Sequence, residues 1–393
     1  MPLKSLKVLD FSTLLPGPYA TMMLADMGAE VLRVEAPNRV DLTRVLPPLD
    51  EQGVSYIHQT LNRSKRSLGL DLKNPTSIDL VKKLVADYDI VIEQFRPGVM
   101  KRFGLDYQSL KEINPKLIYC SITGYGQTGP YMHRGGHDIN YLAISGVASY
   151  TGTKETGPVP VGFQIADVAG GSMHAVNGIL AAVIERQLSG EGQYIDISMT
   201  DAAFALNAMS GAGALGCGES PGLEQEVLNG GTFYNHYETK DGRYFSVGSI
   251  EPQFMQQLCH TIGREDLINN GFDYRAKSQA PLVAALKDAF KQHNFSYWQE
   301  VFVKLDACVE PTLNVIEAAQ HPQIQARDMV IEVTTANNKS IKQIASPIKF
   351  SRSKAKYNFT GCKVGSHNQE VLSELGVTED EYLQLKAQGV LGK

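Results

Sequence analysis

The chain has 393 residues, of which 43% are hydrophobic and 20% charged, an ordinary globular composition with enough material for two or three domains. A formal net charge of −5 gives no reason to expect nucleic acid, whose recognition usually shows as a strongly basic face. Five scattered cysteines, never in C-x-x-C spacing, favour free thiols over a disulfide framework or a zinc site. With no predicted signal peptide or membrane helix, these features predict a cytoplasmic enzyme that binds neither nucleic acid nor membrane.

The first third of the chain predicts strands that alternate with helices. Strands are expected at 6–12, 29–37, 89–95 and 116–126, and helices at 18–28 and 77–88. This alternation is typical of an α/β fold in which helices cover both faces of a parallel sheet. After the first strand the chain reads LLPGPYA instead of G-x-G-x-x-G, so no nicotinamide or flavin dinucleotide is expected.

The rest of the chain predicts further helices and a hairpin. A helical stripe near 173–184 ends at Gly190 and is followed by a strand, YIDISM. Small residues at about 200–231 indicate a helix and a linker, and Asp241-Gly242 indicates a hairpin turn. The nine histidines are dispersed and form no H-E-x-x-H motif, so no metal site is predicted.

Basic residues gather in the loops that follow the predicted strands. Ligands of open parallel sheets bind beyond the carboxyl ends of the strands. Those loops carry Arg39, Arg96, Lys101, Arg102 and Arg134, together with glycines that free backbone N–H groups. Such a crevice suits a phosphorylated ligand, although a lone arginine is more often a solvated surface charge.

Two aspartates, Asp138 and Asp167, each allow a structural and a catalytic interpretation. Asp138 either caps a helix through 139–146, or it holds a backbone or imidazole proton and fixes the tautomer of His137, which would then act as a base. Asp167 either caps a helix that begins near 170, or it serves as an acid or base beside glycines that let a ligand approach. Glu251 precedes a proline at a strand end, where a glutamate is usually solvated.

Long ordered segments resemble the family III coenzyme A transferases from the first strand to the last helices. They include LKVLDFSTLLPGPYATMMLADMGAEVLRVEAP, FRPGVMKRFGLDY, GILAAVIERQLSGEGQYIDISMTDA and GSHNQEVLSELG. Within this family, the segments GHDINY at 136–141, EPQF at 251–254 and DACVEP at 306–311 resemble the racemase branch. The resemblance implies an isomerase that interconverts (R)- and (S)-2-methylacyl-CoA thioesters through an enolate.

The resemblance also implies roles for individual residues. His137 and Asp167 would be the two proton-transfer groups, with Glu251 beside His137 and Asp138 completing the catalytic set. The backbone N–H of Asp167 would donate to the enolate oxygen. Coenzyme A is part of the substrate, so no further cofactor and no metal are implied. The residues that would contact it are Arg39, Arg96, Lys65, Lys101, Arg102, Gly124, Tyr125, Gly126 and Tyr141.

The fold that the resemblance implies is an interlaced homodimer. A large Rossmann-like domain would comprise 1–200 and a C-terminal return at 329–393, joined through a linker at 201–231 to a small α+β domain at 232–328. The active site would be shared, with Glu251 contributed by the partner subunit. The alternative reaction is CoA transfer between carboxylic acids, in which Asp167 would form an acyl anhydride.

Overall fold

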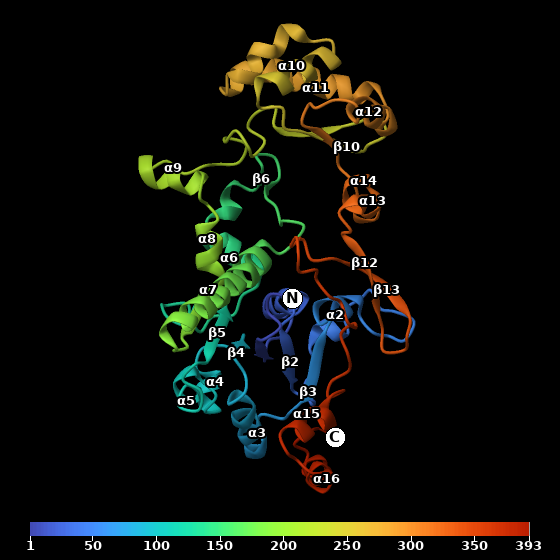
Figure 1. Ribbon diagram of the computed structural model, residues 1–393. Helices are drawn as coiled ribbons and strands as arrows, with labels where there is room; N and C mark the ends of the chain where they lie inside the picture. The colour runs from blue at the N-terminus through green and yellow to red at the C-terminus, as the bar shows by residue number, and fades with distance from the viewer. Residues whose placement is uncertain (393) are drawn as a thin grey trace. The chain divides into compact units, whose positions relative to one another are not determined.

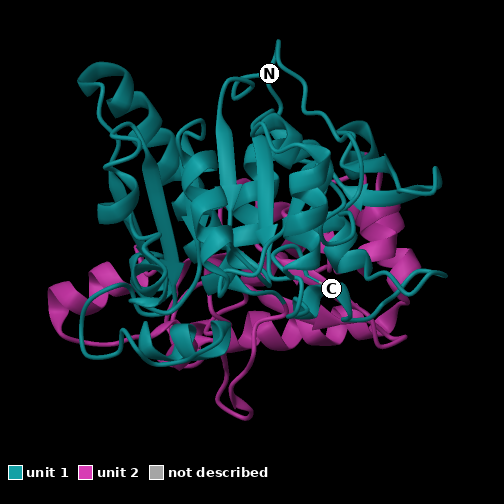
Figure 2. Ribbon diagram, turned by 90° about the horizontal axis from the view of Figure 1, so that it is seen from below, with its two compact units in different colours: residues 1–145, 163–206, 323–393 teal, residues 146–162, 207–322 magenta. Residues whose placement is uncertain are grey.

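The computed structural model describes residues 1–392, which divide into two compact units (Figures 1 and 2). Unit 1 comprises residues 1–145, 163–206 and the chain from 323 onwards, and unit 2 comprises 146–162 and 207–322. Residues 146–162, predicted to lie in the large domain, belong to unit 2. The stretch at about 200–231, predicted as a helix and a linker, holds two helices, α8 (Met199–Ala205) and α9 (Ser210–Cys217).

Unit 1 is built on a six-stranded sheet of order β3-β2-β1-β4-β5-β8. Every neighbouring pair in it is parallel, which confirms the predicted parallel sheet. The strands are β1 (Lys7–Asp10), β2 (Glu30–Glu35), β3 (Lys65–Gly69), β4 (Ile90–Glu93), β5 (Ile118–Thr123) and β8 (Tyr194–Ser198). This is the doubly wound Rossmann order, in which the winding reverses between β1 and β4 and leaves a crevice beyond their carboxyl ends.

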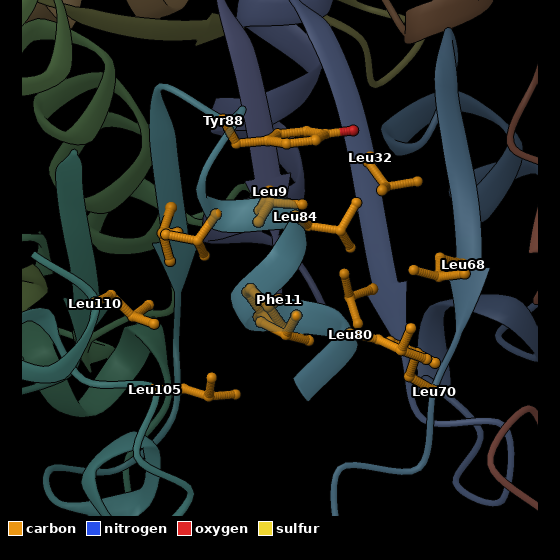
Figure 3. Packing of buried hydrophobic residues seen from close by; sticks show 14 of the residues in the cluster. Leu9, Phe11, Leu32, Leu68, Leu70, Leu80, Leu84, Tyr88, Leu105 and Leu110 are labelled. Atoms are coloured by element: carbon orange, nitrogen blue, oxygen red, sulfur yellow. The ribbon is translucent and has the colours of Figure 1, made fainter. Parts of the chain in front are cut away.

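Helix α3 (Pro75–Val85) shows how the sequence directs packing onto this sheet. The side chain of Asn74 accepts a hydrogen bond from the Thr76 N–H, and Pro75 occupies the first turn, where no N–H is needed. Figure 3 shows Leu80 and Leu84 of α3 directed at the sheet. The buried strand residues in the same cluster include Leu9, Leu32, Val34, Leu68, Val91 and Tyr119, and Phe11, which follows β1, belongs to it as well.

The C-terminal part of the chain returns to unit 1 beside β3. The backbone N–H of Ser67 donates to His367 Nδ1, and that of Gly69 donates to Asn368 Oδ1. The returning elements are the hairpin β12 (Val330–Thr334) and β13 (Ser340–Ile344), followed by α15 (Asn368–Glu374) and α16 (Glu379–Ala387). Both ends of the chain therefore build one unit.

Shorter elements of unit 1 surround the sheet. They are α1 (Pro16–Asp26), η1 (Leu42–Arg44), α2 (Tyr56–Leu61), α4 (Val99–Arg102), α5 (Tyr107–Leu110), α6 (Asp138–Ile144), the π-helix η3 (Ala166–Met173), α7 (His174–Ser189) and α8 (Met199–Ala205).

Unit 2 packs helices against a small antiparallel sheet of order β11-β10-β9. The predicted hairpin is confirmed, with Gly242 at φ 78° in its turn. Trp298 lies in the core and donates its indole N–H to the Phe290 carbonyl. The elements are η2 (Val147–Tyr150), β6 (Gly152–Thr153), β7 (Gly157–Pro158), α9, β9 (Asn235–Glu238), β10 (Tyr244–Val247), α10 (Pro252–Thr261), η4 (Glu265–Phe272), α11 (Ala276–Gln292), α12 (Phe295–Phe302), β11 (Val309–Pro311) and α13 (Val315–Gln320). Helix α14 (Pro322–Ala326) crosses the boundary between the units.

Helices η3 and α7 join into one continuous helix, Ala166–Ser189, that is long and apolar enough to cross a membrane. The expectation that no such stretch exists is wrong, because the two helical segments join without a break. Core helices of globular proteins pass the same test, and Gly178 of α7 lies against Ile195 of β8.

A buried ion pair joins three parts of unit 1. The Arg63 guanidinium donates to both carboxylate oxygens of Asp26, Nε at 2.9 Å and Nη2 at 2.6 Å, while its Nη1 donates to the Ile344 carbonyl. Asp26 ends α1, Arg63 precedes β3, and Ile344 ends β13. Burial raises the pKa of Asp26, and the neighbouring arginine opposes that shift. Removing either partner would leave the other charge buried without a counter-charge.

Replacing Arg63 with methionine should lower the free energy of unfolding by about 3 to 5 kcal/mol, because the Asp26 carboxylate would remain buried without its cation. Urea unfolding of the full chain at neutral pH measures this loss. Lys339→Met is the matched control, because Lys339 pairs with Glu51 at the surface. The control should leave the midpoint unchanged, and equal effects of the two substitutions would contradict the argument.

Candidate active site

The predicted basic loops stand at one edge of the sheet. Because β2, β4 and β5 are parallel members of one sheet, the chain leaves all three at the same edge. Arg39 follows β2, and Arg96, Lys101 and Arg102 follow β4, all with exposed side chains. A methyl group built on Gly135, in the loop after β5, would lie 3.0 Å from Nη2 of Arg96. The loops after β4 and β5 therefore touch each other.

Lys65 does not belong to this basic edge, which corrects its predicted contact with coenzyme A. Its side chain is fully buried, and its ammonium donates to the Pro18 carbonyl at 2.8 Å and to Asn62 Oδ1 at 3.1 Å. The carboxylate of Asp10 lies 3.5 Å away. Burial lowers the pKa of Lys65 to about 8. The amine stabilises the interior beneath α1 and is not available to a phosphate.

The loop after β5 is shaped by the ring of Tyr141. A methyl group on Gly124 or Gly136 would lie 2.5 Å or 2.7 Å from that ring, so both positions require glycine. The Tyr141 hydroxyl donates to the Gly136 carbonyl, and Tyr125 packs edge-on with ring centroids 5.3 Å apart. Tyr141 is only 5% exposed. It supports the loop from within, and its predicted contact with coenzyme A is not supported.

His137 stands at the first position before α6. Its backbone N–H donates to Asn140 Oδ1 at 3.0 Å, and its carbonyl accepts from the Asn140 N–H. The imidazole itself is exposed. His137 is thus the residue before the helix, and its side chain projects at the end of the glycine-rich loop.

The carboxylate of Asp138 caps a different helix from the one predicted. Its Oδ1 accepts the backbone N–H groups of Ala166 at 2.6 Å and Asp167 at 3.1 Å. These are the first two residues of η3, so Asp138 fixes the start of the helix that carries Asp167. The predicted cap of a helix through 139–146 is therefore wrong, whereas the prediction that Asp138 holds a backbone proton is met by these two N–H groups.

This contact also corrects the predicted donor to the enolate oxygen. The Asp167 N–H is already bonded to the Asp138 carboxylate, so it is not free to donate to a substrate. A hydrogen-bond donor to the enolate oxygen would have to come from elsewhere in the loops.

Asp167 lies inside the first turn of the π-helix η3, so it does not cap a helix beginning near 170. Interruptions of an α-helix by π-helical residues occur frequently at functional sites. The buried Ser172 hydroxyl donates to the Pro16 carbonyl at 2.6 Å and lies 3.1 Å from the Asp167 carbonyl oxygen. The side chain of Ser172 therefore ties the start of α1 to the backbone of Asp167.

The Asp167 carboxyl titrates near neutrality. Burial raises its pKa to about 6, and the neighbouring Asp138 carboxylate acts in the same direction. The imidazole of His137 is close enough to act electrostatically in the opposite direction. Unit 1 thus brings His137, Asp138 and Asp167 together, as the sequence predicts.

Glu251 lies in unit 2, where it immediately precedes α10. Its carbonyl accepts the N–H groups of Phe254 and Met255, and Pro252 occupies the first helical position. Its carboxylate lies near Cys308, whose pKa is raised by partial burial and by this negative charge. The predicted pairing of Glu251 with His137 stays a prediction.

The sequence analysis missed a buried acid at the end of β4. Glu93 accepts hydrogen bonds from the Ser121 hydroxyl and the Phe95 N–H, and burial raises its pKa to about 7. It lines a cavity of about 230 Å³ together with Arg96 and Lys101. The available signal was a glutamate at the end of an otherwise apolar strand, DIVIE. Among the described residues, no group of three or more potential metal ligands occurs.

The family model for CoA-transferase family III matches residues 3–368. The chain belongs to this family. It is 33% identical to human alpha-methylacyl-CoA racemase over 395 residues, covering 100% of this chain and 98% of the relative. It is 34% identical to the succinate–glutarate CoA-transferase of Agrobacterium fabrum over 391 residues, covering 96% of each. A crystal structure of a CAIB/BAIF family protein from Brucella suis superposes with a TM-score of 0.83 at 31% identity, covering 95% and 99% of the two chains.

These comparisons confirm the family resemblance. Racemases and transferases of family III stand at similar identity to this chain, so similarity alone does not select the reaction.

Replacing Asp167 with asparagine should stabilise the protein above pH 6 and have little effect below pH 4. The folded-state pKa of about 6 exceeds the ordinary value of 3.8, so the ionised carboxyl opposes folding increasingly as the pH rises from 4 to 6. The gain at pH 8 should be about 1 to 2 kcal/mol, because the carboxyl is only partly enclosed. Thermal or urea unfolding of both proteins across this range measures it. An asparagine variant less stable at pH 8 than at pH 4, relative to wild type, would contradict the shift.

Proposed function

We propose that this enzyme is a racemase of 2-methylacyl-CoA thioesters, acting by removal and return of the α-proton. The observation that carries the proposal is the Asp167 carboxyl beside His137, with its pKa raised to about 6. Histidine side chains ordinarily titrate near pH 6.5. A racemase needs two proton-transfer groups of similar pKa, and an aspartate tuned into the range of histidine meets that requirement.

The chemistry follows from the thioester. Its carbonyl makes the α-hydrogen acidic, so one group removes that proton and leaves a planar enolate. The conjugate acid of the other group returns a proton to the opposite face. His137 and Asp167 would exchange these roles according to which enantiomer is bound. The Asp138 carboxylate would keep the Asp167 backbone in place while the side chain titrates.

Coenzyme A would be held at the carboxyl edge of the sheet. The exposed cations there, Arg39, Arg96, Lys101 and Arg102, complement the phosphates of the nucleotide. The reaction moves only protons, so we propose that it uses no metal, nicotinamide or flavin. The five cysteines are free thiols, which supports a cytoplasmic setting.

A second candidate is CoA transfer between carboxylic acids, which the similarity to the Agrobacterium fabrum transferase favours. Asp167 would then attack the thioester carbonyl, releasing coenzyme A and forming an acyl anhydride. Such a step needs an ionised Asp167 carboxylate, as removal of the α-proton does, but it also needs an acceptor acid to receive coenzyme A.

Incubating a resolved 2-methylacyl-CoA in deuterated water should give both deuterium uptake at the α-carbon and loss of optical purity, with no acceptor acid present. His137→Ala and Asp167→Asn should each lower the racemisation rate by at least about 100-fold, as removal of a general acid–base group does. Mass spectrometry and chiral chromatography follow the two signals.

Binding of coenzyme A should be preserved in both variants, which separates lost chemistry from lost structure. Deuterium uptake that persists in both variants would sink the racemase assignment. Hydroxylamine trapping of an Asp167 acyl adduct, together with turnover that requires an acceptor acid, would establish the transferase instead.

We further propose that the enzyme is an interlaced homodimer whose site combines His137 and Asp167 of one subunit with Glu251 of the other. The support is the family resemblance and the location of these residues in different units of the chain.

Co-expression of His137→Ala and Glu251→Ala chains should restore activity, because a mixed dimer holds one site with all three residues. About a quarter of wild-type activity is expected, since half of the dimers are mixed and each has one intact site of two. Each variant alone should be inactive, and light scattering should give a dimer mass. Absence of complementation in a purified mixed dimer would refute the shared site.

A further inference from the structure

The segment before the C-terminal helices carries an unbalanced positive charge. Between Val333 and Gln369 the chain has no aspartate or glutamate. The same stretch holds seven cations, Lys339, Lys342, Lys349, Arg352, Lys354, Lys356 and Lys363, of which Lys339 pairs with Glu51. In a protein of net charge −5 this concentration is a local reversal of sign.

Residues 345–363, which we call the basic strap, run between β13 and α15 without helix or strand (Figure 1). The strap is nevertheless fixed to unit 1. The Tyr357 hydroxyl accepts the Ser346 N–H at 2.9 Å, and the Tyr357 ring lies 5.0 Å from the Arg63 guanidinium carbon. The Phe359 carbonyl accepts the Ser64 N–H at 2.8 Å.

Alternation along the strap directs its lysines outward. Tyr357 and Phe359 are partly buried against the unit, whereas Lys354 and Lys356 are exposed. Within residues 1–392, no carboxylate forms an ion pair with any of the strap cations, and Lys349 reaches only the Asp328 carbonyl at 3.5 Å. Five like charges therefore stand on one anchored segment without counter-charges.

Apolar side chains are interleaved with these cations. Ile348 and Phe350, on either side of Lys349, are 38% and 43% exposed. Phe350 also lines a groove of about 510 Å³ formed by unit 1 with Leu3, Leu6, Leu180, Val183 and Ile184. Ile184 of α7 is itself 63% exposed. Cations and apolar groups are thus presented by the same part of unit 1.

We propose that the basic strap and the adjoining groove dock the enzyme on an anionic lipid surface. Cations attract the negative headgroups within a Debye length of the surface, and exposed aromatic and aliphatic side chains enter the headgroup boundary. A contact between the straps of two copies is a poorer alternative, because it would bring like unpaired cations together. The inference rests on the strap remaining at the surface of the homodimer proposed above. This surface is distinct from the residues assigned to catalysis, so the inference does not depend on the reaction.

The full-length protein should co-sediment with vesicles of phosphatidylcholine and phosphatidylglycerol but not with phosphatidylcholine alone. The test variant is Lys349→Gln/Arg352→Gln/Lys354→Gln/Lys356→Gln. It should lower the partition coefficient at least about tenfold, given the contribution of each basic residue near a membrane. Binding should weaken as salt is raised, because screening shortens the electrostatic range.

The matched control is Lys240→Gln/Lys277→Gln/Lys287→Gln/Lys304→Gln, which removes the same charge from exposed sites of unit 2. It should bind anionic vesicles like wild type. Phe350→Ser should reduce the binding that remains at high salt, and thermal unfolding checks that it folds. Three results would overturn the proposal: no binding of wild type to anionic vesicles, equal losses in the two charge variants, or a wild-type oligomer that the strap variant dissociates. Retention on nucleic acid without vesicle binding would overturn it as well.

Discussion

The arrangement of the site depends on the carboxylate of Asp138, to which we assign no contact with the substrate. Asp138 holds the first two N–H groups of η3, and these are groups that a helix start leaves without intrahelical partners. The same carboxylate places negative charge beside Asp167, which adds to the effect of burial on its pKa. One side chain therefore fixes the position of Asp167 and adds to the burial that raises its pKa. It also links the loop after β5 to a helix 28 residues further along the chain.

The parallel sheet supplies the rest of the geometry. Because all six strands point the same way, their following loops gather at one edge, and residues from distant parts of the sequence become neighbours. Arg39, Arg96 and His137 reach that edge from three separate connections. The reversal of winding between β1 and β4 opens the crevice there. The Gln94 side chain spans this point, since its Oε1 accepts the Gly17 N–H at 2.9 Å. A backbone–side-chain bond thus joins the start of α1 to the loop after β4.

Sequence reasoning succeeded where the physical cause was local. Periodicity revealed α3, the strand alternation revealed the parallel sheet, and Asp241-Gly242 revealed the hairpin of unit 2. It failed where the partner lies far along the chain. Lys65 sits between charged and polar neighbours and looks exposed, but Asp10 and Pro18 enclose its amine. The true partners of Asp138 are 28 and 29 residues away, beyond the reach of any capping pattern. The continuous helix from η3 into α7 was hidden because a π-helix breaks the 3.6-residue period.

The contact between Tyr141 and two glycines has a consequence for how this loop can vary. Gly124 and Gly136 each leave space that the phenol ring fills completely, so the backbone path is set by steric exclusion as much as by bonding. A larger residue at either glycine would have to displace the Tyr141 ring. A smaller residue in place of Tyr141 would remove the ring that fixes the backbone of this loop. The three positions are therefore sterically coupled, so that a side chain added at either glycine requires space that the Tyr141 ring now occupies.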